Sequence, residues 1–253
     1  MKKKFKGIIV LITSIFIYLM YLPFAFAKSV AGNKLFFRPE DSISKSSVHS
    51  AGFLPGMKSV YDSLHLQLIG LSQQAFDYAQ KGLEKLIAQG RIINDSIVSI
   101  ADFSQSSNMK RLYILDIKNY KVLFNTLVAH GRNSGKELAN SFSNQASSFK
   151  SSPGFYITGE TYNGNNGYSL KLEGIEKGIN DNAYHRAIVM HGADYVNESI
   201  ATARGYIGRS EGCPAVPEGK AVPIISTIKN GTCFFVYTPT ASYLQHSTML
   251  GAS

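Results

Sequence analysis

The chain has 253 residues, of which 44% are hydrophobic and 17% charged, enough for one large domain or for a domain with a helical extension. Its 26 lysine and arginine residues outnumber 17 acidic residues, which gives a formal net charge of +9. A mild basic excess suits an anionic surface. Because no basic and aromatic run accompanies it, we expect no nucleic-acid site.

The first 27 residues predict a secretory signal peptide. Four lysines in 1–6 precede a stretch without charge, 7–27, which ends in Ala25-Phe26-Ala27 and fits the small-residue cleavage rule. Cleavage there would start the exported protein at Lys28 and lower its net charge from +9 to +5, because those four lysines leave. The alternative is an uncleaved anchor, since 7–27 approaches the ~20 residues that span a bilayer.

A linker and a helical region are expected in 28–91. The part 28–54 is serine-rich and has no sustained period, which is typical of a linker or an irregular surface segment. Two amphipathic helices follow, the second with Ser72 as N-cap and Gly90 at its end. Their apolar stripes, which we expect to face the core, are Met57, Val60, Tyr61 and Leu64, then Phe76, Ala79, Leu83, Leu86 and Ile87.

From residue 92 the pattern changes to short β-rich runs, with a hairpin at Lys118-Asn119 and a turn-forming cluster at 163–167. No alternation with long helices appears, so a doubly wound sheet is disfavoured. We therefore predict a mainly β fold, a sandwich or barrel in 92–240, with the N-terminal helices packed on it and a C-terminal tail in 241–253. The expected strands are 97–101, 112–117, 121–129, 155–161, 168–172, 187–190 and 232–237.

The chemistry is expected between residues 187 and 217. The apolar run 187–190 delivers His191, and a loop with two glycines delivers Cys213 between Gly212 and Pro214. This context predicts a thiol exposed on a stiff turn. A neighbouring histidine that accepts its proton would make it a nucleophile, and turn amides at Gly212 and Cys213 would face a developing oxyanion.

Two neighbouring features leave alternatives open. His130 ends a strand much as His191 does, and either lines the site or has a structural role. The serine-rich segment 140–152 either covers a groove or is a solvated connector.

Other residues in the sequence suggest alternatives to a Cys213 nucleophile. Residues 208–212 match G-x-S-x-G, which would make Ser210 a hydrolase nucleophile with Glu218 and His246 in the expected order, but the prolines that follow disfavour the helix such a turn must open. His185 and His191 lack a third ligand, so we expect no metal and no cofactor. Cys233, in an apolar strand, is expected to be a core residue and not to pair with Cys213.

The sequence resembles the L,D-transpeptidases, the YkuD-type cell-wall cysteine enzymes, and among them a divergent branch with a Gly-Cys-Pro motif. The runs HGADYV at 191–196 and GRSEGCPAVP at 208–217 carry the likeness, which spans roughly 92–239. Supporting runs are KRLYILD at 110–116, AHGRNSG at 129–135 and GFYITGETYNGNNGYSLKLEG at 154–174.

The resemblance implies Cys213 as nucleophile, His191 as base and the Gly192 carbonyl as the group that orients the imidazole. It implies peptidoglycan stem peptides as partners, an exported location in the periplasm or cell envelope, and contact with the membrane only through the signal segment. The commoner family pattern has Ser/Thr-His-Gly-Cys before a bulky residue and Arg or Asn, and this chain departs from it. Candidate substrate-binding residues are Arg209, Ser210, Arg204 and His130.

Three functions remain open at this point. The first is an L,D-transpeptidase that cross-links or trims stem peptides through a thioester, with L,D-carboxypeptidase activity as a variant. The second is another exported cysteine or serine hydrolase. The third is a wall-binding module without chemistry.

Overall fold

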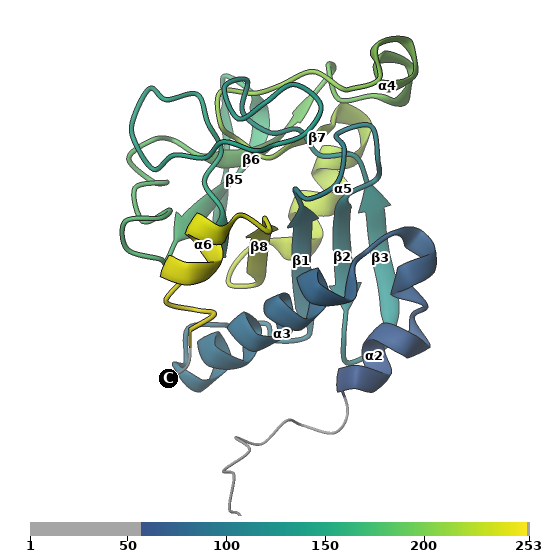
Figure 1. Cartoon of the computed structure of the whole chain (residues 1–253), viewed down its shortest axis with the longest axis vertical. Coiled ribbons are helices and arrows are strands. Elements are labelled where there is room, and N and C mark those ends of the chain that lie inside the picture. Colours follow the sequence, from purple (N-terminus) through teal and green to yellow (C-terminus); the bar gives the residue numbers. More distant parts are fainter. Residues whose placement is uncertain (1–56, 252–253) are drawn as a thin grey trace, which may run out of the picture. The chain divides into compact units, whose positions relative to one another are not determined.

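A computed structural model describes residues 57–251 (Figure 1). The predicted signal peptide, 1–27, and the predicted linker, 28–54, lie outside these residues. Within them, no helix is both long and apolar enough to cross a membrane. The helical elements are α2 (Met57–Ser63), the 3-10 helix η1 (Leu66–Ile69), α3 (Gln73–Ala88), α4 (Glu198–Arg204), α5 (Glu218–Ile228) and α6 (Ala241–His246). The strands are β1 (Ile97–Asp102), β2 (Leu112–Asp116), β3 (Lys121–Thr126), β4 (Gly154–Gly164), β5 (Gly167–Gly174), β6 (Val189–Ala193), β7 (Ala215–Pro217) and β8 (Cys233–Tyr237).

The eight strands form one mixed sheet in the order β3-β2-β1-β8-β4-β5-β6-β7. The pairs β1–β8 and β6–β7 are parallel, and the other pairs are antiparallel. The sheet curls until its two ends meet, because Ala129, just beyond β3, forms a bridge with Ala215 of β7. This barrel-like closure confirms the predicted fold class and brings the segment after β3 beside β6 and β7.

The sheet carries helices on both faces, α3 on one and α5 on the other (Figure 1). The side chains of β8 alternate between the two faces, so this one strand contributes to both hydrophobic clusters. Cys233, Phe235 and Tyr237 join the cluster that contains α3, whereas Phe234 and Val236 join the cluster that contains α5. Because successive side chains of a strand point to opposite faces, a fully apolar strand is required here.

The helix α3 follows its sequence signals closely. The Ser72 side chain caps it by accepting a hydrogen bond from the Ala75 amide at 3.1 Å. The expected stripe faces the core except at its last member, because Ile87 is 39% exposed and its inclusion was wrong. The stripe shares one hydrophobic cluster with β1 and β8, so the described helices before residue 92 belong to the core of the sheet.

The segment predicted as a C-terminal tail is part of the core. Tyr243, Met249 and Leu250 are buried in the cluster of α3. The fully buried Glu176 carboxylate accepts hydrogen bonds from the hydroxyls of Tyr243 (3.1 Å) and Ser247 (2.5 Å). Apolar residues are too few in this short segment for the sequence to predict that it packs on the core.

The sequence interpretation missed α5 and the short strand β7 before it. It took the prolines near residue 217 as the end of regular structure, yet Pro217 only precedes the helix, and Pro223 costs a single intrahelical hydrogen bond. The buried residues Ala221, Ile224, Ile225 and Ile228 recur at i, i+3, i+4 and i+7, so a helical period was present. The strand predicted at 187–190 also begins later, at Val189, because Ala187 has a φ of 52° and belongs to a turn.

Candidate active site

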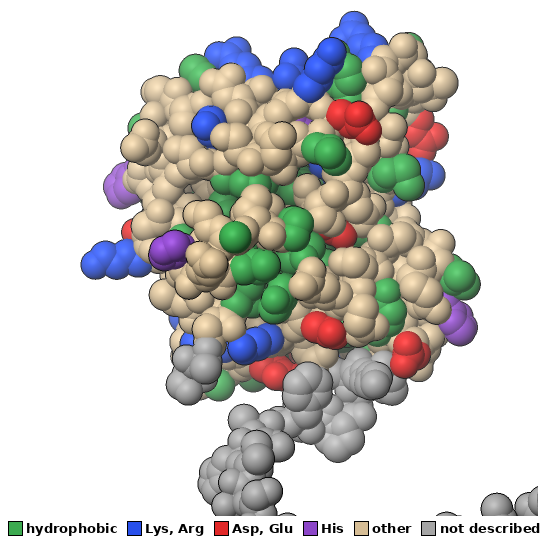
Figure 2. All heavy atoms as spheres, in the orientation of Figure 1, with side chains coloured by type: hydrophobic (Ala, Val, Ile, Leu, Met, Phe, Trp, Pro, Cys, Tyr) green, Lys and Arg blue, Asp and Glu red, His purple; other side chains and the backbone are tan. Residues whose placement is uncertain are grey.

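A groove of about 980 Å³ opens where β6 and β7 meet the loops around them. Figure 2 shows lysine and arginine side chains along the end of the molecule at which Figure 1 places these strands. His191 and Cys213 both line the groove. The other lining residues include Arg132, Ser147, Phe149, Arg186, Gly192, Asp194, Tyr195, Arg209, Ser210, Glu211 and Glu218.

The parallel pair β6–β7 brings the histidine and the cysteine together. His191 is paired with Ala215, two residues beyond Cys213, and on its other side with Ser169 of β5. The strand β6 is therefore held on both edges at the position of the imidazole. A histidine fixed at this point of a central strand has little freedom to leave the groove.

The imidazole of His191 is oriented by its own neighbour. Its Nδ1 lies 2.8 Å from the Gly192 carbonyl oxygen, which can only accept, so Nδ1 carries the proton and donates. The other ring nitrogen, Nε2, is then free to accept a proton from a group in the groove. This contact is the one that the resemblance implied for Gly192.

Gly192 also lets the helix α5 approach. A Cβ at this position would lie 2.9 Å from the Ala221 Cβ and 3.1 Å from the Glu218 Cα. Only glycine therefore fits between β6 and α5 without displacing one of them.

Cys213 is half-buried and packs partly against the core, so the thiol is less exposed than the sequence predicts. Its Sγ donates to the Ala187 carbonyl oxygen at 3.8 Å. Burial raises the pKa of the Cys213 thiol, while the Val189 amide and the Arg186 guanidinium act against that rise. The resting side chain is therefore a thiol whose proton must be taken by a base when it reacts.

The turn before Cys213 is built from internal hydrogen bonds. The Gly212 amide donates to the Ser210 hydroxyl oxygen at 3.0 Å, and that hydroxyl donates to the Cys213 carbonyl at 2.6 Å. The expectation that the Gly212 amide faces an oxyanion was therefore wrong, because this donor is already engaged. The Cys213 amide remains as the candidate from the predicted pair.

Ser210 is occupied in the same way, and the hydrolase alternative lacks its other parts. His246 lies on α6, lines a different cavity, and its Nδ1 contacts the Ser242 carbonyl at 2.8 Å. Glu218 does line the groove, but no histidine of the G-x-S-x-G reading accompanies it there. The geometry thus opposes Ser210 as a nucleophile and gives it the role of shaping the turn.

The candidate arginines have different places. Arg209 lines the groove, and its Nη1 donates to the carbonyls of Arg132 (3.3 Å) and Gly135 (3.1 Å). Arg204 is exposed in the last turn of α4 and is not among the lining residues of the groove. Arg132, which sequence reasoning did not select, stacks on Phe149 at 4.0 Å and pairs with Glu211 at 3.4 Å.

His130 does not line the groove, so its place among the substrate-binding candidates was wrong. It is fully buried, with Nδ1 2.7 Å from Arg111 Nη2 and Nε2 3.3 Å from the Gly135 carbonyl oxygen. Burial and the Arg111 cation lower the pKa of His130 to about 3, so the imidazole is neutral. Its role is to support the loop that carries Arg132.

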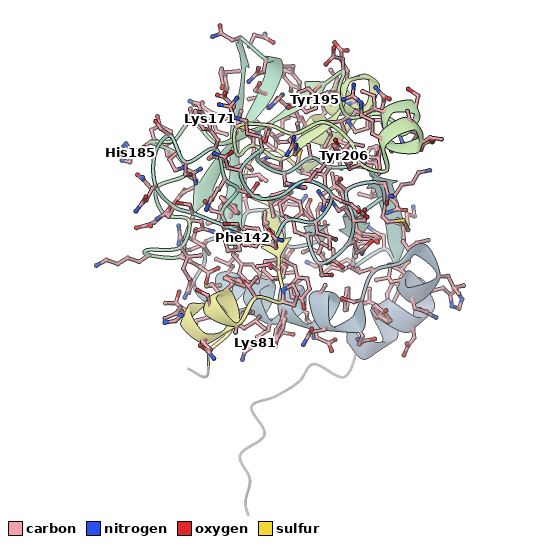
Figure 3. All side chains as sticks on the ribbon, turned by 45° about the horizontal axis from the view of Figure 1, so that its top comes forward. Lys81, Phe142, Lys171, His185, Tyr195 and Tyr206 are labelled. Atoms are coloured by element: carbon pink, nitrogen blue, oxygen red, sulfur yellow. The ribbon has the colours of Figure 1, made fainter. Side chains whose placement is uncertain are left out.

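The sequence did not identify several residues of the groove as candidate site residues. Tyr195 and Tyr206, labelled in Figure 3, lie on the segments that enter and leave α4, and Tyr195 also lines the groove. Burial raises the pKa of Tyr195 to about 12, so it stays a hydrogen-bond donor. The HGADYV run already contained this tyrosine. By contrast, nothing around Arg186 marked it in the sequence.

No group of three or more histidine, cysteine or acidic residues within 57–251 is placed to hold a metal ion. His185 is exposed and lies at the margin of the molecule, away from Tyr195 (Figure 3). Both cysteines are free, and Cys233 is fully buried in β8, where burial raises its pKa to about 12.

Comparisons with known proteins give the family. The model of the L,D-transpeptidase catalytic domain matches residues 68–237, which also takes in most of the helical region before residue 92. No curated protein sequence matches this chain.

Solved structures similar to the chain include an L,D-transpeptidase in complex with imipenem (12% identity, TM-score 0.35, covering 56% of this chain and 59% of that one). A second is an L,D-transpeptidase from Mycobacterium smegmatis (12% identity, TM-score 0.35, covering 56% of this chain and 59% of that one). A third is an L,D-transpeptidase from Stackebrandtia nassauensis (13% identity, TM-score 0.35, covering 73% of this chain and 77% of that one). The chain thus spans about three fifths of the length of the first two. The match over more than half of its residues shows that this chain belongs to the L,D-transpeptidase catalytic domain family.

Proposed function

We propose that this protein is a peptidoglycan L,D-transpeptidase that works through a thioester on Cys213. The thiolate attacks the carbonyl that joins the third residue of a stem peptide to its terminal D-residue. His191 Nε2 accepts the thiol proton and donates it to the departing amine, so that a thioester forms as the peptide bond breaks. An amine from a second stem then attacks the thioester, which frees the sulfur and forms a new cross-link.

One observation carries this proposal. His191 and Cys213 line one groove, and the hydrogen bond from Nδ1 to the Gly192 carbonyl leaves Nε2 as the proton acceptor. A buried thiol with a raised pKa needs such a base, because little thiolate is present without one. Family membership supplies the substrate class.

The oxyanion of the tetrahedral intermediate needs a donor near the sulfur. We assign this role to the Cys213 amide, because the Gly212 amide is held by Ser210. The Arg209 side chain, on the groove wall, is the candidate for the substrate carboxylate, since its guanidinium has donors beyond the two carbonyls it contacts.

Water in place of the second amine would give L,D-carboxypeptidase activity from the same acyl-enzyme. The groove volume of about 980 Å³ is ample for an extended peptide beside the nucleophile, which favours a peptide acceptor. The signal sequence further leads us to propose export to the periplasm or cell envelope, with Lys28 as the mature N-terminus. Mass spectrometry of the N-terminus tests this, and an intact residue 1 on membrane-bound protein would favour an anchor.

The deciding experiment incubates the mature protein with purified muropeptides and identifies the products by mass. Replacement of Cys213 with alanine should abolish turnover, by about 10⁴-fold or more, while the fold is retained. The matched control is Cys233→Ala, which removes the other thiol and should keep turnover.

A carbapenem or a donor tetrapeptide should leave a covalent adduct that peptide mapping places on Cys213 alone. Turnover by Cys213→Ala or an adduct on Ser210 would refute the cysteine mechanism. Retention of muropeptides without turnover by the wild type would indicate a wall-binding module, and cleavage of ordinary L-L bonds a different hydrolase.

A further inference from the structure

Arg186 is held directly behind the cysteine turn by groups from the serine-rich segment. It lies in the turn before β6, and its Nη1 donates to the Ser143 carbonyl (2.8 Å) and the Ser152 hydroxyl (2.6 Å). Its Nη2 donates to the Ser148 hydroxyl (3.2 Å) and the Lys150 carbonyl (2.6 Å). One guanidinium therefore fixes a segment about forty residues away in sequence against the start of the histidine strand.

The same guanidinium lies beside the turn that carries the nucleophile. A Cβ built on Gly212 would lie 3.2 Å from Arg186 Nη2 and 2.8 Å from the Lys150 carbonyl oxygen. Gly212 adopts a φ of 127° at this point of closest approach, and its carbonyl accepts a hydrogen bond from the Ser151 hydroxyl at 3.1 Å. The backbone immediately before Cys213 therefore rests on the segment that Arg186 holds.

The charge of Arg186 is not neutralised by a carboxylate. Among the described residues every ion pair involves other side chains, and the four polar partners of Arg186 are neutral hydroxyls or carbonyls. The Cys213 sulfur is one of two groups whose negative form favours the charged guanidinium, together with Tyr156, whose pKa burial raises above its ordinary value. Of these two, Cys213 is the one that can ionise in the reaction.

Direct binding of a substrate carboxylate by Arg186 is excluded by its hydrogen bonds. All four Nη hydrogens are used by the contacts described above. The remaining donor, Nε, is buried without a partner, so no fork of two hydrogens is available for a carboxylate. Arg186 acts on the reaction only through its neighbours.

We propose that Arg186 is a positioning residue for the nucleophile, which holds the Cys213 turn against residues 148–152 and supplies a fixed positive charge that stabilises the thiolate. The inference rests on the proposed function in that it assumes Cys213 to be the reacting group. Burial makes the thiolate costly, and a fixed cation beside it offsets part of that cost while His191 holds the proton.

The test is the pH dependence of iodoacetamide alkylation of the full mature chain, measured for wild type, Arg186→Gln, Arg186→Met and Arg186→Lys. Cys233 is fully buried, so alkylation reports Cys213. In the neutral variants the alkylation midpoint should rise by about one pH unit, which lowers the rate near neutral pH about tenfold. Arg186→Lys keeps the charge and should return the midpoint toward that of the wild type.

The matched control is Arg209→Gln, which removes one charge from the same groove at a side chain that donates to the Arg132 and Gly135 carbonyls, lies 5.9 Å from the Tyr206 ring and does not act on the pKa of Cys213. Its alkylation midpoint should stay that of the wild type. An unchanged midpoint in a folded neutral variant would overturn the inference. So would a folded Arg186→Lys variant whose midpoint rises by a full pH unit, since the positive charge would then not be what sets the midpoint.

Alkylation requires no peptidoglycan, so a failure of this inference can be told apart from a failure of the proposed function. A raised midpoint in a protein without muropeptide turnover would leave the role of Arg186 standing and remove the transpeptidase assignment. An unchanged midpoint in an active enzyme would do the reverse.

Discussion

Two His-Gly pairs lie in this sheet or just beyond one of its strands, and their histidines differ in role. His130-Gly131 follows β3 and His191-Gly192 lies in β6. His130 is fully buried with both ring nitrogens engaged, and its burial, together with the Arg111 guanidinium, lowers its pKa and keeps the imidazole neutral. His191 uses only Nδ1, for the Gly192 carbonyl, and its other nitrogen faces a groove that also holds a cysteine.

The comparison shows that the local sequence does not separate a structural histidine from a reactive one. What differs is the second partner. A cation against His130 makes protonation unfavourable, whereas His191 has a thiol within the same groove that can give up a proton. Four experiments test this difference between His130 and His191.

The largest effect is expected from replacing His191 with glutamine. The amide has a similar volume but cannot accept and return a proton, so muropeptide turnover should fall by about 10²- to 10⁴-fold. The melting temperature should stay close to that of the wild type, because among the described residues the imidazole makes a single hydrogen bond, to the Gly192 carbonyl. Alkylation of Cys213 should also slow near neutral pH, and equal alkylation rates at every pH would show that His191 is not the base.

The matching change at the other pair, His130→Ala, should act on stability instead. It leaves an Arg111 N–H without its acceptor in a fully buried place, which should cost about 1–3 kcal/mol in the free energy of unfolding. Urea unfolding measures this cost. His130→Asn, whose amide oxygen can replace Nδ1 as acceptor, should recover part of it, and equal losses in the two variants would contradict the assigned hydrogen bond.

The pH dependence of stability gives the third contrast. The pKa of His130 is lowered from 6.5 to about 3, so between these values the unfolded chain binds a proton that the folded protein does not. Proton binding at His130 in the unfolded chain therefore leaves the free energy of unfolding unchanged above pH 6.5. Below pH 6.5 it lowers this free energy by up to about 1.4 kcal/mol per pH unit. His130→Asn should flatten this part of the profile, measured by urea unfolding at several pH values.

The smallest effect is expected from Gly192→Ala. The new Cβ would lie 2.9 Å from the Ala221 Cβ, so β6 or α5 must shift by a few tenths of an ångström and carry the Gly192 carbonyl with it. We expect a loss of about 1 kcal/mol in stability and a several-fold loss in turnover. Gly219→Ala on the same helix meets open space and is the control that should change neither.

Much of this architecture could be predicted from the sequence. The fold class, most strand positions, the Ser72 cap and the pairing of His191 with Cys213 in one groove followed from period, turn residues and family likeness. These signals are local, or are carried by a motif of adjacent residues. The helix α5 was missed because Pro214 and Pro217 were taken as the end of regular structure, although a regular apolar period follows them.

The role of Arg186 and the burial of His130 could not be predicted, because both depend on groups that only the folded chain brings together. Arg186 is bound by Ser143 and Ser152, and His130 by Arg111, which lies just before β2. No spacing rule links such positions. The half-buried state of Cys213 belongs to the same class, since its cover comes from Ala187 and Val189 across the groove.

The parallel pairing of β1 with β8 sets the order in which the chain can fold. Val98 is paired with Cys233, and the cluster that covers α3 also needs Tyr243, Met249 and Leu250. Lys81 and Lys85 of α3 complete the closure by donating to the carbonyls of Leu250 (2.6 Å) and Thr248 (2.9 Å). The early helices therefore have no finished core until residues 233–250 have been synthesised, and folding must wait for contacts across most of the described chain, which makes it slow.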